Sequence, residues 1–337
     1  MAQDDESGPQ LDNPPSRLSQ LTKRSWIDVL KRTVKEFNDD NLTDWAAALT
    51  YYGVLSIFPG ILVLLAVSGM LLTDTTQDAV IRNAQELFPK SVAEPVTGAV
   101  DELKQGSGSA GFLAIVGLLG ALWTASGYVG AFIRAANAIY DVPEGRPIWK
   151  VLPIRLGVTV VVGVLISVAA MSIVFTGRFA EKVGGWIGLS QQAVQIWDIA
   201  KWPVLLLIVL LILAVLYWAS PNARQTGFRW VTPGGGLAVF IWLAASAGFA
   251  IYVSNFSSYN KTYGTLGGII AFLVWLWISN IAILLGAEFD AELERGRAIQ
   301  GGMPQEKEPF IPLRDASKVK DDRDPDLKAT EDRDPDL

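Results

Sequence analysis

The stretch GTLGGIIAFLVWLWISNIAILLGA, residues 264–287, decides the fold class of this chain because it contains no charged residue over 24 positions. An α-helix needs ~20 such residues to cross ~30 Å of hydrocarbon. Five further segments have the same character, at about residues 47–72, 110–133, 153–176, 202–219 and 235–256. The sequence therefore predicts an all-α, polytopic membrane protein with six transmembrane helices.

The charged residues, 18% of the chain, gather toward its two ends. Residues 1–20 and 302–337 are rich in charge and poor in large apolar side chains, and DRDPDL occurs twice, at 322–327 and 332–337. Segments of this composition cannot bury enough surface to offset chain entropy. We therefore expect a disordered N-terminal tail at 1–20, a six-helix membrane domain at 21–301 and a disordered charged C-terminal tail at 302–337.

The chain contains neither cysteine nor histidine, which limits its chemistry. Disulfides, thiol nucleophiles, haem and iron–sulfur clusters are excluded, as is zinc held by His or Cys. We expect no cofactor and no metal. A basic, aromatic-bearing surface for RNA is also missing, so no nucleic-acid partner is expected. The acidic N-terminus lacks an apolar core, so no cleavable signal peptide is predicted.

Basic residues alternate between the loops, and this alternation orients the helices. Lys and Arg collect next to the cytoplasmic ends of membrane helices. They cluster before the first segment and after the second, fourth and sixth, whereas the alternate loops are longer and poorer in them. Both termini are therefore predicted to be cytoplasmic.

Short helices are predicted outside the membrane as well. SWIDVLKRTVKEF, residues 25–37, places Trp26, Leu30, Val34 and Phe37 on one face. Such a helix lies in the inner headgroup region or packs on its own protein, and both interpretations stay open. In the outer loops we expect short helices at 75–88, 91–105 and 184–201.

The second segment carries a polar stripe, because Ser126, Gly130, Arg134, Asn137 and Asp141 recur at three- and four-residue spacing and so share one face. Polar groups at membrane depth are costly and usually face protein or a water-filled cavity. The stripe therefore nominates Ser126, Arg134 and Asn137 as site residues.

The first and sixth segments add further polar candidates. Asn280 and Glu288 lie eight residues apart on one face of the sixth. The first begins with Asp44 and then presents a cluster before its proline, made up of Tyr51, Tyr52, Ser56 and Pro59. We expect helices 1, 2 and 6 to form a polar seam.

At ~1.5 Å per residue, Arg134, Glu288 and Asp44 all fall near the inner boundary of the membrane. We expect Arg134 to pair with Glu288 or Asp44 beneath a cavity open to the cytoplasm. The alternative is that each side chain reaches separately into the headgroups.

Proline and small residues suggest where helices break and meet. Pro59 lies inside the first helix and predicts a kink, which serves either a binding site or packing. The pairs Gly264 with Gly268 and Ala244 with Gly248 have the spacing of close helix contacts. We expect both pairs to serve packing within the bundle.

Several motifs, in order, resemble the YihY/BrkB family of bacterial inner-membrane proteins, formerly labelled ribonuclease BN. They are ALTYYGVLSIFPG (48–60), LWTASGYVGAFIRAANAIYDV (122–142), YWASPNAR (217–224), PGGGLAVFIWL (233–243), YVSNFSSYNKTYGTLGG (252–268) and LLGAEFDAELER (284–295). The resemblance covers about residues 25–297. It implies a location in the bacterial cytoplasmic membrane and a role in transport, including transport of lipids.

These observations favour a transporter or permease for a lipid or an anionic solute, with membrane lipids as its surroundings. The alternative is a non-transporting membrane scaffold whose tails recruit other proteins. A membrane-bound hydrolase is a third hypothesis, and we do not expect an enzyme. Ribonuclease chemistry conflicts with the absence of histidine, because zinc-dependent RNA cleavage needs a His-rich ligand set.

Overall fold

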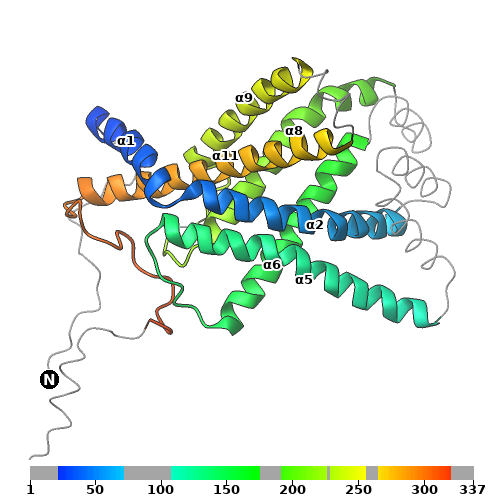
Figure 1. Cartoon of the computed structure of the whole chain (residues 1–337), viewed down its shortest axis with the longest axis horizontal. Coiled ribbons are helices and arrows are strands. Elements are labelled where there is room, and N and C mark those ends of the chain that lie inside the picture. Colours follow the sequence, from blue (N-terminus) through cyan, green and yellow to red (C-terminus); the bar gives the residue numbers. More distant parts are fainter. Residues whose placement is uncertain (1–21, 72–107, 175–190, 226–227, 256–264, 320–337) are drawn as a thin grey trace, which may run out of the picture.

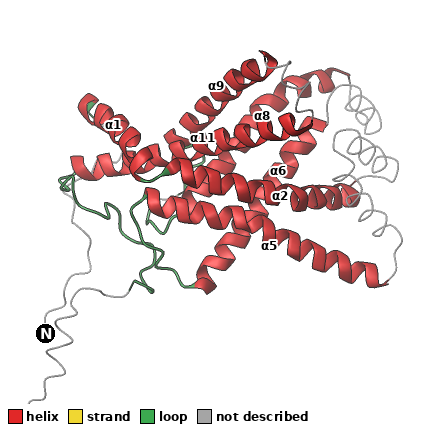
Figure 2. Cartoon of the chain, viewed as in Figure 1, coloured by secondary structure: helices red, strands yellow, loops and turns green. Residues whose placement is uncertain are grey.

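The computed structural model describes residues 22–71, 108–174, 191–225, 228–255 and 265–319, and over these ranges the chain is helical without strands (Figures 1 and 2). Six long helices follow a shorter one. In chain order they are α1 (Lys23–Asp39), α2 (Leu42–Leu71), α5 (Gly108–Ile139), α6 (Ile148–Val174), α8 (Gln191–Ala219), α9 (Pro233–Asn255) and α11 (Thr265–Gln300).

The long helices match the six apolar segments in order, and four of them are long and apolar enough, within the described ranges, to cross a membrane. These four stretches are Ile148–Ile173, Gln195–Ala219, Pro233–Ser254 and Gly267–Gln300. Only 28% of the apolar stretch in α8 and 11% of that in α9 is buried inside the protein. Such outward-facing apolar surface is what a lipid environment requires. The structure thus supports a multi-pass membrane protein, and the six-span topology stays a prediction.

Two helix boundaries differ from the sequence interpretation. The helix expected at 184–201 is not separate where it is described, because residues 191–201 form the first turns of α8 and continue through Pro203. The sixth helix continues to Gln300, beyond the apolar segment that ends at 287. The outer-loop helices expected at 75–88 and 91–105 lie outside the described residues.

All the connections described between the long helices lie at one end of the bundle, which we call the α1 end (Figure 1). It holds α1, the start of α2, the end of α5, the start of α6, the end of α8, the start of α9 and the end of α11. Within the bundle, α2 packs against α5 and α11, α9 packs along α11, and α6 packs against α8. This arrangement brings the first, second and sixth apolar segments together.

The closest helix contact occurs where α9 crosses α11. A Cβ placed on Gly286 would lie 2.5 Å from the carbonyl oxygen of Gly234 and 2.7 Å from the Tyr217 hydroxyl. Only residues without side chains fit there. Of the pairs expected from sequence, Gly248 and Gly268 are not contact points, because nothing lies within 4 Å of a Cβ on either, and Gly264 lies outside the described residues. Spacing alone does not show which helix face meets a neighbour.

Helix α1 packs one face on the protein and exposes another. Val29 is fully buried against Phe289 and Leu293 of α11, and Arg32 forms an ion pair with Glu292. The side chains of Ile27, Leu30 and Val34 are more than half exposed. Of the apolar face predicted for 25–37, Trp26 and Phe37 pack on the protein, whereas Leu30 and Val34 are exposed.

Residues 302–319, which we call the C-terminal strap, lie against the α1 end. Phe310 and Ile311 are buried, Leu313 bridges to Ala223, and the Arg314 N–H donates to the Asn222 carbonyl at 2.7 Å. The sequence placed the start of a disordered tail at 302, and the structure corrects this for the strap. A few apolar residues and backbone hydrogen bonds anchor it despite its charge. The expected N-terminal tail at 1–20 and residues 320–337 of the expected C-terminal tail lie outside the part of the chain that the structure describes.

Candidate functional site

A hydrogen-bonded triad joins the three helices that the sequence placed around a polar seam. The Tyr128 hydroxyl of α5 donates to Oδ1 of Asn280 on α11 at 2.9 Å, and the Asn280 amide donates to Oγ1 of Thr50 on α2 at 3.1 Å. Asn280 is 1% exposed. Hydrogen bonding of this kind satisfies polar side chains that lipid cannot solvate. The seam between α2, α5 and α11 is therefore polar at Asn280.

Toward the α1 end, the same face of α11 carries a buried carboxyl group. Glu288 lies eight residues beyond Asn280, or ~12 Å along the helix, and is 1% exposed. Its neighbours are the carboxyl groups of Asp40, Glu292 and Glu36. Its Oε2 is buried and has no hydrogen-bond partner among the described residues. Four acidic side chains thus converge where α1 and α2 meet α11.

Two acids at the rim of this cluster, Asp40 and Asp141, lie in the connections between helices, and their pKa values are raised above the ordinary value for an aspartate. Burial, together with the neighbouring carboxyl groups of Asp141 and Glu36, raises the pKa of Asp40 to about 7. Burial and the charge of Glu308 raise the pKa of Asp141 to about 6, against the opposing charge of Arg295. The rim therefore changes its protonation within the neutral and mildly acidic range.

Arg295 neutralises part of the cluster from its centre. Its guanidinium lies within 3.2–3.9 Å of four carboxylates, those of Glu36, Asp141, Glu292 and Glu308. The guanidinium of Arg295 also lies over the Phe310 ring at 5.7 Å, which ties the strap to the cluster. Among the described residues, no group of three or more potential ligands is arranged to hold a metal ion. The cluster forms an ion-pair network around Arg295.

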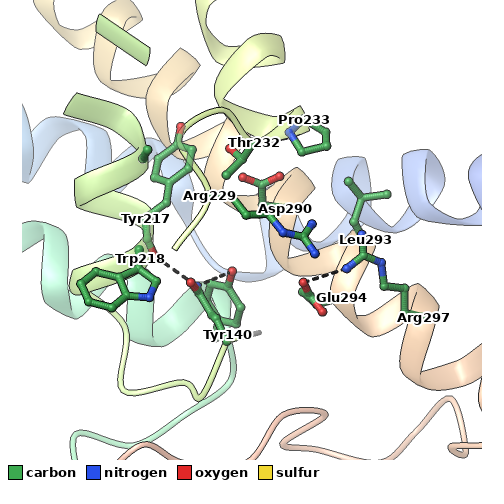
Figure 3. Close-up of a pocket in the computed structure, with 12 residues that line it drawn as sticks. Tyr140, Tyr217, Trp218, Arg229, Thr232, Pro233, Asp290, Leu293, Glu294 and Arg297 are labelled. Atoms are coloured by element: carbon green, nitrogen blue, oxygen red, sulfur yellow. Dashed lines mark hydrogen bonds and ion pairs between the residues drawn. The ribbon is translucent and has the colours of Figure 1, made fainter. Parts of the chain in front are cut away.

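A separate pocket of about 40 Å³ opens beside the end of α8 and the start of α9 (Figure 3). Charged side chains of both signs line it, from Arg229, Asp290, Glu294 and Arg297. Oδ1 of Asp290 accepts the Gly234 N–H at 2.7 Å and so caps the first turn of α9. A cavity of this volume holds a few water molecules. The pocket therefore supports the α9–α11 junction and is too small for a lipid or an organic solute.

Asn137, a site candidate, belongs to a network that fixes the loops at the α1 end. Its Oδ1 accepts the Asn222 N–H at 2.7 Å, and its amide donates to Glu144 at 3.0 Å. Glu144 also forms a two-pronged pair with Arg146, which is 2% exposed. Burial opposes ionisation of Glu144, yet hydrogen bonds from Arg146 and Asn137 lower its pKa. Asn137 therefore has a structural role.

The backbone of α5 at Ser126 meets α6, while the Ser126 hydroxyl donates to the Trp123 carbonyl within α5. Arg155 of α6 donates through Nε to the Ser126 carbonyl at 2.7 Å, and its guanidinium lies over the Trp123 ring at 5.3 Å. Arg134 lies two turns beyond Ser126 on the same face of α5. Arg134 and Tyr52 are the two ionisable side chains that interact electrostatically with Arg155. We call Trp123, Ser126, Gly130, Arg134 and Arg155 the arginine groove.

The structure overturns the expected pairing of Arg134. Its side chain is exposed, and in the described part of the chain it forms no ion pair with Glu288 or Asp44. Glu288 faces α1, and Asp44 is exposed in the first turn of α2. The sequence predicted the same level along the helix axis for all three residues. The orientation of each helix about its own axis points their side chains in different directions.

The tyrosine cluster of the first segment is divided as well. Tyr51 is 61% exposed, whereas the Tyr52 ring packs where a Cβ on Gly127 would lie, 2.8 Å from its Cδ1. The Ser56 hydroxyl donates to the Tyr52 carbonyl at 2.7 Å, one turn back in its own helix. Pro59 lies within the continuous helix α2, its side chain falls outside the described part, and its kink stays a prediction.

Several residues at these sites were absent from the sequence candidates. Asp40 and Arg295 lie beyond the apolar segments, where charge is ordinary, so composition gave no reason to select them as site residues. Asp141 belonged to the polar stripe of the second segment but was not taken from it as a site residue. Arg155 counted only as a basic residue near a loop, yet it lies seven residues inside α6. Counting its depth from the N-terminus of the helix would have identified it as an unusual charge.

Comparison with known proteins places the chain in a family. The family model described as "Virulence factor BrkB" matches residues 33–309. The "Putative ribonuclease-like protein YfkH" of Bacillus subtilis is 30% identical over 259 residues, which cover 77% of this chain and 92% of that protein. No solved structure matches the chain.

Relatives from other bacteria carry a membrane designation. A "UPF0761 membrane protein" of Chromohalobacter salexigens is 30% identical over 298 residues, 84% of this chain and 68% of that protein. Another from Alteromonas mediterranea is 27% identical over 279 residues, 79% of this chain and 87% of that protein. With four apolar spans in the described helices and a family match over most of its length, this chain is a multi-pass membrane protein that belongs to the BrkB virulence factor family.

Proposed function

We propose that this protein is a permease of the bacterial cytoplasmic membrane, with six spans, both termini in the cytoplasm and a lipid or anionic solute as its substrate. Helices α2 and α5 supply the two spans beyond the four apolar stretches, since they have 30 and 32 residues. The basic loops support this orientation. The seam between α2, α5 and α11 is the proposed pathway.

One observation carries the proposal: a buried carboxyl group with a partnerless oxygen lies on the same helix face as a buried hydrogen-bonded amide. Glu288 and Asn280 are each 1% exposed and lie on α11, whose stretch Gly267–Gln300 is long and apolar enough to cross a membrane. Polar groups at such depth are expensive and typically mark pathways for ions or substrates. A scaffold has no need of them, because apolar side chains would pack the same helices at less cost.

The ribonuclease-like name of the Bacillus subtilis relative suggests an enzyme instead. Our proposal is that this chain is not one. It has no histidine, and two acids of the cluster at the α1 end, Glu292 and Glu36, are held in ion pairs with Arg32 and Arg295. These are poor ligands for a catalytic metal pair, which needs free carboxylates.

Flux measured in proteoliposomes tests the function. Fluorescently labelled phosphatidylglycerol reports lipid movement through dithionite quenching, and radiolabelled phosphate reports anion efflux. We expect the wild-type protein to accelerate one of the two, and Asn280→Leu and Glu288→Gln to reduce that flux at least tenfold. Ser167→Ala is the matched control, because Ser167 is also buried, at 8% exposure, and its hydroxyl donates to the Gly163 carbonyl within α6. Full flux in both seam variants, or no acceleration of either probe, would refute the proposal.

Single cysteines test the topology, since the chain has none of its own. Ser317 on the strap and Ser254 near the end of α9 are both exposed. In spheroplasts, an impermeant maleimide should label Ser254→Cys directly and Ser317→Cys only after permeabilisation. Labelling of both residues in intact spheroplasts would contradict the orientation.

A further inference from the structure

The arginine groove places a guanidinium against the backbone of α5. The Arg155 Nε–H bonds the Ser126 carbonyl, and the Trp123 ring covers one face of the planar group. Gly130 makes room, because a Cβ there would lie 3.2 Å from Nε of Arg155 and 3.3 Å from its Cζ. These contacts hold the side chain in one orientation. Within the described ranges its hydrogen bond to the protein is made through Nε, which leaves the two Nη groups available for a ligand.

A second cation lies beside the first. Arg134 follows Gly130 by one turn on the same face of α5, and it acts electrostatically on Arg155. Neither guanidinium forms an ion pair with a carboxylate in the described part of the chain. Two like charges on one face repel each other, and a bound anion would relieve this repulsion.

The groove opens toward the lipid. Trp123 is 57% exposed, and Val160 and Val161, just past Arg155 on α6, are 48% and 45% exposed. Arg155 lies seven residues into a helix of which only 22% of the apolar stretch is buried, ~10 Å from its start at the α1 end. A soluble anion would have to leave water to reach this depth, whereas a phospholipid already carries its phosphate to the edge of the hydrocarbon.

We propose that the arginine groove binds the phosphate group of an anionic phospholipid in the leaflet at the α1 end. Arg155, fixed by Ser126 and Trp123, presents the fork of its guanidinium to two phosphate oxygens, which is the geometry that suits this side chain. Arg134 supplies the second positive charge from the rim. Binding at this groove does not depend on the proposed permease function, because a lipid can bind there without being moved.

Lipid titration of the detergent-solubilised full chain, followed by native mass spectrometry, tests the proposal. The probes are phosphatidylglycerol and phosphatidylcholine, with inorganic phosphate and glycerol 3-phosphate as soluble competitors. We expect phosphatidylglycerol to bind in preference, and Arg155→Gln or Arg134→Gln to weaken it about tenfold. Arg155→Lys, which keeps the charge but loses the fork, should fall between them and the wild type.

Arg314→Gln is the matched control, because Arg314 also lies over a tryptophan, Trp218 at 5.4 Å, at the same end of the bundle. It should leave the lipid affinity unchanged. Equal phosphatidylglycerol affinity in the wild type and both groove variants would overturn the proposal, as would an equal loss in the control. Displacement by millimolar phosphate would show that the site takes a soluble anion instead. Arg134 is exposed, so its variant decides the matter even if an Arg155 variant fails to fold.

Discussion

Replacing Gly286 by alanine should separate α9 from α11. The added Cβ would lie 2.5 Å from the Gly234 carbonyl oxygen, 2.7 Å from Cβ of Ala238 and 2.7 Å from the Tyr217 hydroxyl. Two of these three atoms belong to the backbone or to a Cβ, so they cannot turn aside. Either the helices move apart or the new methyl group is strained.

The cost can be worked out from these contacts. Ordinary contact begins near 3.4 Å, so the approach to Gly234 is about 0.9 Å too close. Overpacking of this kind costs about 1–3 kcal/mol. Displacing the Tyr217 hydroxyl also breaks its hydrogen bond to the Ile283 carbonyl, now 2.6 Å, for about 1 kcal/mol more. We expect the free energy of unfolding to fall by about 2–4 kcal/mol.

Equilibrium unfolding in mixed detergent micelles measures this loss, and Gly248→Ala is the control. A Cβ on Gly248 meets nothing within 4 Å, although its sequence motif also suggests a contact. Without a clash, alanine in a helix is favoured over glycine by about 0.5–1 kcal/mol, so the control should be neutral or slightly more stable. If Gly286→Ala unfolds like the control, the crossing described for α9 and α11 is wrong.

Two further substitutions test the α1 end. Asp40→Asn should raise the melting temperature over wild type, and by more at pH 8 than at pH 5. The pKa of Asp40 is about 7 in the folded state, above its unfolded value, so its ionisation destabilises the fold progressively as pH rises from about 4 to 7. A gain in melting temperature that is independent of pH would contradict this reasoning. Asn222→Ala removes side-chain bonds to Pro143 and to both backbone groups of Asp315, at a cost of about 2–4 kcal/mol. Hydrogen exchange should then quicken in the strap around Asp315, and unchanged protection there would show that Asn222 does not anchor it.

The helices themselves could be predicted from the sequence because apolar composition is a local property. A run such as 264–287 has to be helical in lipid, where each backbone group needs a partner within its own segment. The helix boundaries were harder to predict. Helix α11 continues to Gln300 through charged residues, which the apolar composition of a membrane segment does not identify as helical. Helix α1 was recognisable from its 3.6-residue period, which also needs no tertiary information.

The candidate site was predictable only in part, and Asn280 shows why. Its depth and polarity marked it as interior, but its partners, Tyr128 and Thr50, come from 152 and 230 residues away. Arg134 shows the opposite case, because the level predicted for it along its helix suggested a pairing with Glu288 or Asp44 that the described contacts do not include. Rotation about the helix axis decides which neighbour a side chain meets, and rotation is set by packing with other helices.

Composition and local spacing were enough to show that this chain lies in a membrane, which ends of its helices carry charge and that it has no Cys or His side chains. The contacts between Glu288 and Asp40, between Arg155 and the groove of α5 and between the C-terminal strap and the α1 end became visible only in the folded molecule. Each of these contacts joins distant segments, and their free energies depend on orientation and burial that no single segment contains.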